Sequence, residues 1–296
     1  MRRTVSVFVD CRGHGMGDGS NTESIGALVD ELTYGDITAR AHAAEALGRQ
    51  RPQARAAVPA LIKALSDSAS RVWTRAGHAL FVIGPDATAV PALVRELTNE
   101  QLHVRCHSAR ALVKTQPSPI DALPALLRAV REEEDWPVVD SVWWALHVIG
   151  PASVPPLDEM LRHGDPRTRR RAAYCLMSGR IERLQRAIVP LLHALDDEDG
   201  RVRRIALQSL GWNAVRYKRA AGTFDEAWAG VPQRVGRCLA DADVGLRWEA
   251  ARTLLQFGPD ARPAIADLTS VLGDDDEQIR TWAALSLRAI QQGQTV

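Results

Sequence analysis

The sequence has few aromatic residues, few cysteines and almost no net charge. Only 5% of its 296 residues are aromatic although 46% are hydrophobic, so the apolar residues are mostly Ala, Leu and Val, as is typical of helices. The four cysteines lie far apart and form no CxxC pair, which excludes a zinc framework and a disulfide scaffold. The formal net charge of +1 excludes a uniformly basic nucleic-acid coat and an acidic disordered tail. Any function that depends on charge must therefore be local.

Long hydrophobic runs are also absent. No stretch approaches the roughly 18 consecutive apolar residues that a membrane helix needs. The apolar run within residues 1–9 is too short for a signal peptide. We therefore expect a soluble, cytoplasmic protein without a membrane partner.

An internal repeat organises most of the chain. The segment VPALIKAL at 58–65 recurs as VPALVREL at 90–97, LPALLRAV at 123–130, VPPLDEML at 154–161 and VPLLHAL at 189–195. Each copy precedes a second helical segment that one leucine anchors, and successive anchors lie 30 to 34 residues apart except for one interval of 44. The pattern predicts eight repeats, with an insertion near 212–224. The anchors are Leu47, Leu80, Leu112, Leu146, Leu176, Leu210, Leu254 and Leu287.

The chemistry inside each repeat predicts two antiparallel helices. A proline such as Pro59 stands near the start of the first helix, where a missing N–H costs least. In the second helix, the residues eight and four before the anchor, such as Val72 and Ala76, are apolar or small almost throughout and form a stripe that faces the core. One equivalent place before the second helix holds a short polar side chain that can cap free amides: Asp67, Asn99, Asp197, Asp241 and Asp274.

This pattern resembles the HEAT repeat family, specifically the short bacterial type that is also found in phycobilin lyases. The resemblance covers roughly residues 24–291 and implies an all-α fold, a right-handed α-solenoid (superhelix) of about eight antiparallel helix pairs. In this family an arginine of the second helix commonly pairs with a turn aspartate, which builds a ladder along the array. Trp73 and Val139 replace that arginine in two repeats. The matching residues are Arg40, Arg105, Arg169, Arg203, Arg247 and Arg280.

The same alignment divides the chain into three parts. We expect residues 24–291 to form a single solenoid, residues 1–23 to form an irregular or flexible leader, and residues 292–296 to form a tail. The glycine-rich leader lacks the strand, the Gly-Lys-Ser/Thr motif and the helix of a phosphate-binding loop.

The resemblance also implies that the second helices line a concave surface where such proteins usually bind. Positions six and two before each anchor point most directly away from the core stripe. In the middle of the array these positions are rich in arginine and aromatic residues, the usual anchors of a binding surface, and hold one carboxylate, Asp140. The groove residues that these positions predict are His78, Arg110, Trp144, Arg170, Tyr174, Arg204, Gln208, Trp248 and Arg252.

Charge is concentrated in one segment. Residues 160–220 contain 14 Arg and Lys against six Asp and Glu, a local charge of +8, so the remainder of the chain carries about −7. This segment favours an anionic partner, and nucleic acid is one candidate.

The most unusual segment is DWPVVDSVWW at 135–144. Trp136, Asp140 and Trp144 are spaced i, i+4 and i+8 on a helix that Pro137 could start. The segment resembles the HEAT-like DNA glycosylases that remove alkylated purines, in which a Trp-x-x-x-Asp pair, an arginine and a later tryptophan frame the lesion. The matching residues are Trp136, Asp140, Arg170 and Trp212, so Trp136 and Trp212 join the predicted groove and Asp140 is the candidate catalytic residue.

These features predict a non-catalytic binding scaffold whose groove takes a protein, a peptide or an anionic ligand. The first alternative is a DNA-binding enzyme of the glycosylase type, and the second is an accessory or modifying protein of a biosynthetic pathway. His103 and His107 share a helical face but lack convincing further ligands, so we predict no metal and no cofactor. We expect a monomer.

Overall fold

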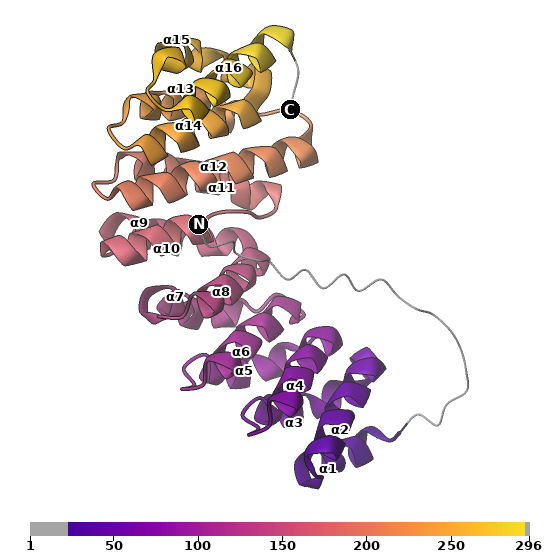
Figure 1. The fold of residues 1–296 in the computed structure, drawn as a ribbon. Helices are drawn as coiled ribbons and strands as arrows, with labels where there is room; N and C mark the ends of the chain where they lie inside the picture. The colour runs from indigo at the N-terminus through magenta and orange to yellow at the C-terminus, as the bar shows by residue number, and fades with distance from the viewer. Residues whose placement is uncertain (1–22, 294–296) are drawn as a thin grey trace.

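The computed structural model describes residues 23–293, which form sixteen α-helices joined by short turns, several of them 3₁₀. The predicted all-α solenoid of eight helix pairs is confirmed (Figure 1). The first helices of the pairs are α1 (Ile25–Tyr34), α3 (Val58–Ala64), α5 (Val90–Glu96), α7 (Leu123–Glu132), α9 (Val154–His163), α11 (Ile181–His193), α13 (Val231–Arg237) and α15 (Ile265–Ser270). The second helices are α2 (Ile37–Gln50), α4 (Ser70–Ile83), α6 (Leu102–Lys114), α8 (Trp136–Ile149), α10 (Pro166–Cys175), α12 (Gly200–Ala221), α14 (Val244–Phe257) and α16 (Glu277–Gln292).

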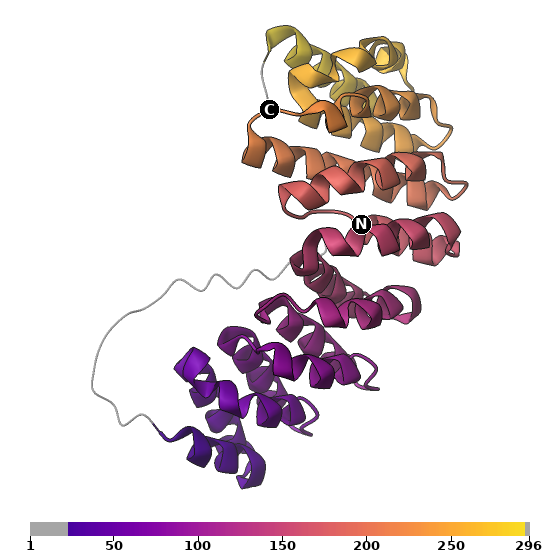
Figure 2. The ribbon, with the colours of Figure 1, turned by 180° about the vertical axis from the view of Figure 1, so that it is seen from behind.

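The helix pairs stack in chain order along one curved array. Both views show that the helices of the first four pairs lie obliquely, whereas those of the last four run across the picture, so the array changes direction between α8 and α10 (Figures 1 and 2). Neighbouring second helices lie closer together than neighbouring first helices, which places the second helices on the inner side of the curve. The backbones of α8 and α10 approach one another over a shorter length than those of any other neighbouring second helices.

The core follows the predicted stripe. In α4 the side chains of Val72, Ala76 and Leu80 are fully buried, and the equivalent residues of α6, α12 and α14 are buried in the same way. Two positions differ from the sequence analysis. Ala41 stands at an outward position, six residues before the anchor Leu47, but is buried, and the last anchor, Leu287, is partly exposed at the end of the described array.

The polar residues before the second helices cap backbone amides as predicted. The Asp67 carboxylate accepts a hydrogen bond of 2.9 Å from the amide of Ala69. The four equivalent residues make the same bond to the residue two positions further on, which fixes the turn that leads into each second helix.

Five of the six predicted arginines form the ladder. Each binds a carboxylate in the turn of the next repeat and also donates to carbonyl oxygens, as Arg40 does to Asp67 and to the carbonyl of Gly35. The sixth, Arg280, lies in the last described repeat and, among the described residues, donates only to the carbonyls of Asp274 and Asp275. The remaining pairs are Arg105–Glu133, Arg169–Asp197, Arg203–Asp241 and Arg247–Asp274.

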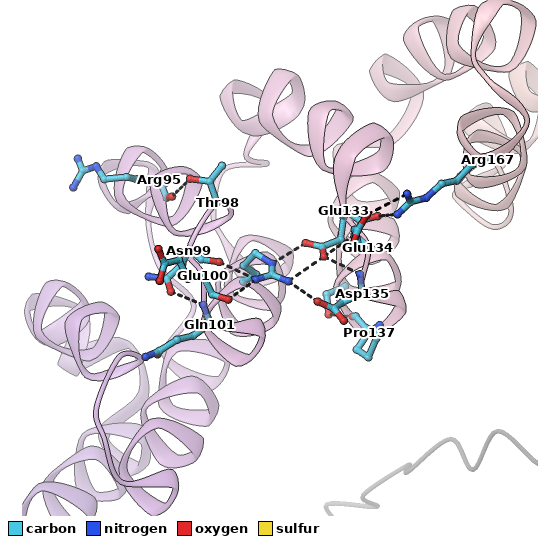
Figure 3. Close-up of polar contacts among 12 residues, drawn as sticks. Arg95, Thr98, Asn99, Glu100, Gln101, Glu133, Glu134, Asp135, Pro137 and Arg167 are labelled. Carbon is cyan, nitrogen blue, oxygen red and sulfur yellow. Dashed lines mark hydrogen bonds and ion pairs between the residues drawn. The ribbon is translucent and has the colours of Figure 1, made fainter.

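The third repeat carries the most extensive of these pairs. Arg105 donates to Glu133 at 2.8 Å, to Asp135 at 2.7 Å, and to the carbonyls of Asn99 and Glu100 (Figure 3). Burial alone would raise the pKa of Glu133, but the hydrogen bonds from Arg105 and from two backbone amides outweigh it and hold that pKa below its usual range.

The ladder is interrupted at the two positions that lack the arginine. Trp73 stacks on His103 of the next repeat with ring centroids 4.2 Å apart and also touches His107. Val139 is buried in the core. At the first place the contact with the next repeat is this ring stack, and at the second place Arg167 of the next repeat pairs with Glu134 at 3.6 Å.

The long interval between the anchors Leu210 and Leu254 is filled by an extension of α12. This helix has 22 residues, against 14 in α14, and ends at Gly222. The turn that follows packs Phe224 and Trp228 against Tyr217 at centroid distances of 6.2 and 5.4 Å. Both rings also pack on Phe257 of α14, so the extension is joined to the main core.

The ends of the chain lie outside the described part. The leader predicted for residues 1–23 falls there except for Glu23, and so does the predicted tail beyond residue 293. Within residues 23–293, no helix is both long enough and apolar enough to cross a membrane.

The ladder predicts a large loss of stability when Arg105 is replaced. Arg105→Ala would leave the carboxylate of Glu133, whose side chain is only 6% exposed, without its cation. We expect a loss of about 3 kcal/mol in the free energy of unfolding, measured by urea denaturation. The matched control is Arg49→Ala, which breaks an i,i+4 pair with Glu45 whose arginine is 64% exposed and should cost about 0.5 kcal/mol or less. Equal losses in the two variants would contradict a structural role for the ladder.

Candidate functional site

The predicted groove residues lie on the second helices of the inner layer, and none of them is buried. The tryptophans Trp136, Trp144 and Trp212 are the most prominent because they remain 45%, 45% and 55% exposed. The other predicted residues are partly or fully exposed: His78, Arg110, Asp140, Arg170, Tyr174, Arg204, Gln208, Trp248 and Arg252.

Asp140 and Tyr174 meet across the junction between α8 and α10. The Tyr174 hydroxyl donates a hydrogen bond of 2.7 Å to Oδ1 of Asp140, and the ring of Trp136 lies 5.0 Å from the tyrosine ring. Burial, followed by the hydrogen bond to Asp140, raises the pKa of Tyr174 far above its usual range. The phenol therefore stays protonated and acts as the donor, so one oxygen of the only predicted groove carboxylate is occupied within the protein.

Trp143 is a central residue that the sequence analysis missed. Its indole N–H donates a hydrogen bond of 2.7 Å to the carbonyl of Met177, and its ring lies 5.2 Å from Trp144 and 5.8 Å from Tyr174. Trp143 is half-buried between α8 and α10 and joins the two helices. The signal in the sequence was the pair Trp143-Trp144, of which only the outward-pointing member was considered.

The short helix α10 ends in a turn that side chains from other helices hold in place. Asn213 of α12 accepts from the amide of Ser178 at 2.6 Å and donates to the carbonyl of Leu176. Arg183 of α11 is fully buried and donates to the carbonyl of Cys175 at 2.5 Å and to that of Ser178. Burial lowers the pKa of Arg183 to about 10. These bonds satisfy the free carbonyls at the end of α10.

The basic segment 160–220 is less available than its net charge indicates. Arg169 and Arg203 belong to the ladder, and three further cations pair with carboxylates. Arg171 and Arg183 are buried and donate mainly to backbone carbonyls. The cations of this segment that make no salt bridge within the described residues are Arg170, Arg180, Arg186, Arg201, Arg204, Arg216 and Arg219.

Two predicted groove residues towards the carboxyl-terminal end bind a carboxylate of the protein itself. Arg252 donates to the buried carboxylate of Glu249 at 2.5 Å and lies over the ring of Trp248, while Gln208 donates to the other oxygen of Glu249 at 3.0 Å. Sequence analysis did not find this pairing, because Glu249 lies next to the core stripe and was not considered. Exposed indole rings and arginines without a described salt bridge lie together on α8, α10 and α12, and Arg110 of α6 is a further exposed arginine without one.

The four residues of the glycosylase resemblance are only partly brought together. Trp136 and Asp140 share the contact with Tyr174, and Arg170 lies one helical turn before that tyrosine. Within residues 23–293, no ring contact or hydrogen bond connects Trp212 with these residues. The catalytic role of Asp140 stays a prediction.

Comparison with known proteins identifies the repeats. Residues 144–211 match the family model of HEAT repeats, and residues 39–67 match the PBS lyase HEAT-like repeat. The chain therefore carries HEAT-type repeats, as the sequence resemblance predicted. No curated protein matches the sequence as a whole.

Solved structures with the same architecture are helical solenoids. Importin β aligns with a TM-score of 0.59 at 14% identity, over 92% of this chain and 41% of that chain, and a Kap95:Nup1 complex aligns with a TM-score of 0.57 at 15% identity, over 91% and 41%. This chain spans about two fifths of the length of these two proteins. The complex of CpcE and CpcF of phycocyanin lyase from Nostoc sp. aligns with a TM-score of 0.40 at 21% identity, over 95% of this chain and 98% of that chain.

The environment of His147 predicts a pH-dependent stability. Burial, with the charges of Arg183, Arg216 and Arg180, lowers the pKa of His147 from 6.5 to about 4. The unfolded chain therefore binds a proton at a higher pH than the folded chain, so the stability from neutral His147 is complete above about pH 6.5 and is lost as the pH falls towards about 4. We expect His147→Gln to melt with a smaller difference between about pH 7 and about pH 5 than the parent does.

The control for this prediction is His163→Gln, because His163 is exposed on α9 and its side chain is 70% accessible. This variant should keep the pH dependence of the parent. Thermal unfolding followed by circular dichroism gives the melting temperatures. Identical pH dependence in the parent and in His147→Gln would contradict the proposed burial of the neutral imidazole.

Proposed function

We propose that this protein is a binding scaffold whose inner layer takes an extended segment of another protein across α8, α10 and α12. The observation that carries this proposal is the exposure of Trp136, Trp144 and Trp212 on that layer. Tryptophan and arginine dominate the energetics of protein interfaces. Each of these indoles offers on the order of 100 Å² to a partner, and burial of that area contributes about 2.5 kcal/mol.

The surroundings of the tryptophans support a preformed surface. The rings of Trp136 and Trp144 already pack on Tyr174 and Trp143, so little rotamer freedom is lost when a partner covers their open faces. The Kap95:Nup1 complex has the same type of fold, which supports the use of such a layer for protein recognition.

Selection from a displayed library of random linear peptides tests this proposal. We expect the parent protein to enrich binding peptides, and the triple variant Trp136→Ser, Trp144→Ser and Trp212→Ser to bind them at least about 30-fold more weakly, because each indole contributes as an interface anchor. Fluorescence anisotropy with the labelled peptides measures the affinities.

The matched control is Val189→Ser, which removes an apolar side chain that is 55% exposed on the first helix α11. This variant should bind the peptides as the parent does. The proposal fails if the parent enriches no peptide, or if a correctly folded triple variant binds the enriched peptides with unchanged affinity.

A further inference from the structure

Three arginines lie around the turn that follows α10. This turn lies between α8 and α12, because Trp143 of α8 donates to the carbonyl of Met177 and Asn213 of α12 donates to the carbonyl of Leu176. Arg180 belongs to this turn, Arg216 to α12 and the buried Arg183 to α11, and the charges of all three contribute to the lowered pKa of His147 in α8. Trp144 contacts His147 with ring centroids 6.0 Å apart. Trp212 lies one helical turn before Arg216 and shares its face of α12. We call Trp144, Arg180, Trp212 and Arg216 the carboxyl-end patch.

The positive charge of this patch is not neutralised by the described part of the protein. Arg180 and Arg216 are exposed and form no salt bridge within residues 23–293, in contrast to the ladder arginines. Arg183 beneath them bonds to carbonyl and hydroxyl oxygens and to no carboxylate. Three cations are therefore gathered without an acidic partner, and burial of the third leaves its charge poorly screened by water.

The turns at the opposite end of the same helices hold many carboxylates. The turns that lead into α8 and α12 contain the runs EEED at 132–135 and DDED at 196–199, and the turn before α14 contains Asp241 and Asp243. Figure 3 shows Glu133, Glu134 and Asp135 together at the start of α8. Arginines pair with most of these carboxylates, but the side chains of Glu134 and Glu198 stay 85% and 83% exposed.

The exposed carboxylates of these turns favour one class of anion over another. A nucleic-acid duplex carries one charge per about 1.7 Å along its whole length and would place phosphates against the acidic turns as well as against the arginines. A protein segment with a few carboxylates can confine its charge to the basic end. The planar guanidinium groups of Arg180 and Arg216 suit bidentate contact with carboxylates, and the flanking indoles suit an aromatic or long aliphatic side chain.

We infer that the carboxyl-end patch docks an acidic linear segment of a partner protein, with its carboxylates on Arg180 and Arg216 and an apolar side chain between Trp144 and Trp212. This inference rests on the proposed function and names the chemistry of the partner.

Two synthetic peptides serve as probes. The first is a short labelled peptide of alternating Glu and Leu, and the second is its analogue with Gln in place of Glu. We expect the Glu peptide to bind at least about tenfold more tightly at low ionic strength, and this difference to shrink at about 0.3 M salt, where exposed charges are screened. Trp212→Ala should weaken both peptides.

Matched pairs of variants separate this patch from general charge effects. Arg180→Gln with Arg216→Gln should weaken the Glu peptide about tenfold and leave the Gln peptide unchanged. Arg186→Gln with Arg237→Gln removes the same charge from exposed arginines of the first helices α11 and α13 and should change neither affinity. Unchanged thermal unfolding in both pairs shows that the variants are folded.

Failure of this inference can be told apart from failure of the proposed function. Tryptophan-dependent binding of library peptides that are not acidic, unaffected by the Arg180 and Arg216 substitutions, would overturn the acidic partner alone. Equal weakening of the Glu peptide by both arginine pairs would also overturn it, as would tighter, salt-sensitive binding of duplex DNA through the same two arginines. The absence of any tryptophan-dependent peptide binding would overturn both proposals.

Discussion

The structure depends on the contact between each second helix and the next. One helix pair of this length cannot bury its own apolar face, so every repeat is stable only because its neighbour covers it. The small residues of the core stripe, such as Ala76 and Ala206, allow the second helices to come close. The arginine ladder also joins successive repeats, because each guanidinium reaches from its own helix to a carboxylate in the turn of the following repeat.

The two interruptions of the ladder follow a common rule. Where Trp73 replaces the arginine, stacking on His103 joins the repeats. Where Val139 replaces it, the fourth and fifth repeats are joined by the hydrogen bonds from Tyr174 to Asp140 and from Trp143 to Met177. Aromatic side chains therefore take part in the contact between repeats at both places, and at the second an ion pair from Arg167 to Glu134 adds to them. The second place is also where α8 and α10 approach one another over a short length and where the array changes direction.

The sequence predicted the fold more completely than it predicted the site, and the reason is physical. A repeated pattern of Pro, Asp and Leu determines the local helices and the stripe through which they pack, so the eight pairs and the ladder arginines could be found from periodicity. Whether a charged side chain is exposed, buried or paired depends on residues that are far away in the chain. Arg183 was counted as a surface cation but is buried on the carbonyls of α10, and Arg252 was expected to face a ligand but binds Glu249. Helical spacing gives the direction of a side chain and does not determine its partner.

The packing of the aromatic rings at the junction between α8 and α10 leaves two indole rings exposed. The rings of Trp136 and Trp143 pack on Tyr174 across the two helices, and Trp144 packs on Trp143, while the open sides of Trp136 and Trp144 remain in contact with water. The hydrogen bond from Tyr174 also occupies one oxygen of Asp140, the only carboxylate on α8, α10 and α12 in this part of the inner layer. Asp140 therefore competes less well with a partner's carboxylates for the nearby arginines. The interruption of the ladder, the change in direction of the array and the exposed indoles beside arginines without a described salt bridge thus meet at the same aromatic junction.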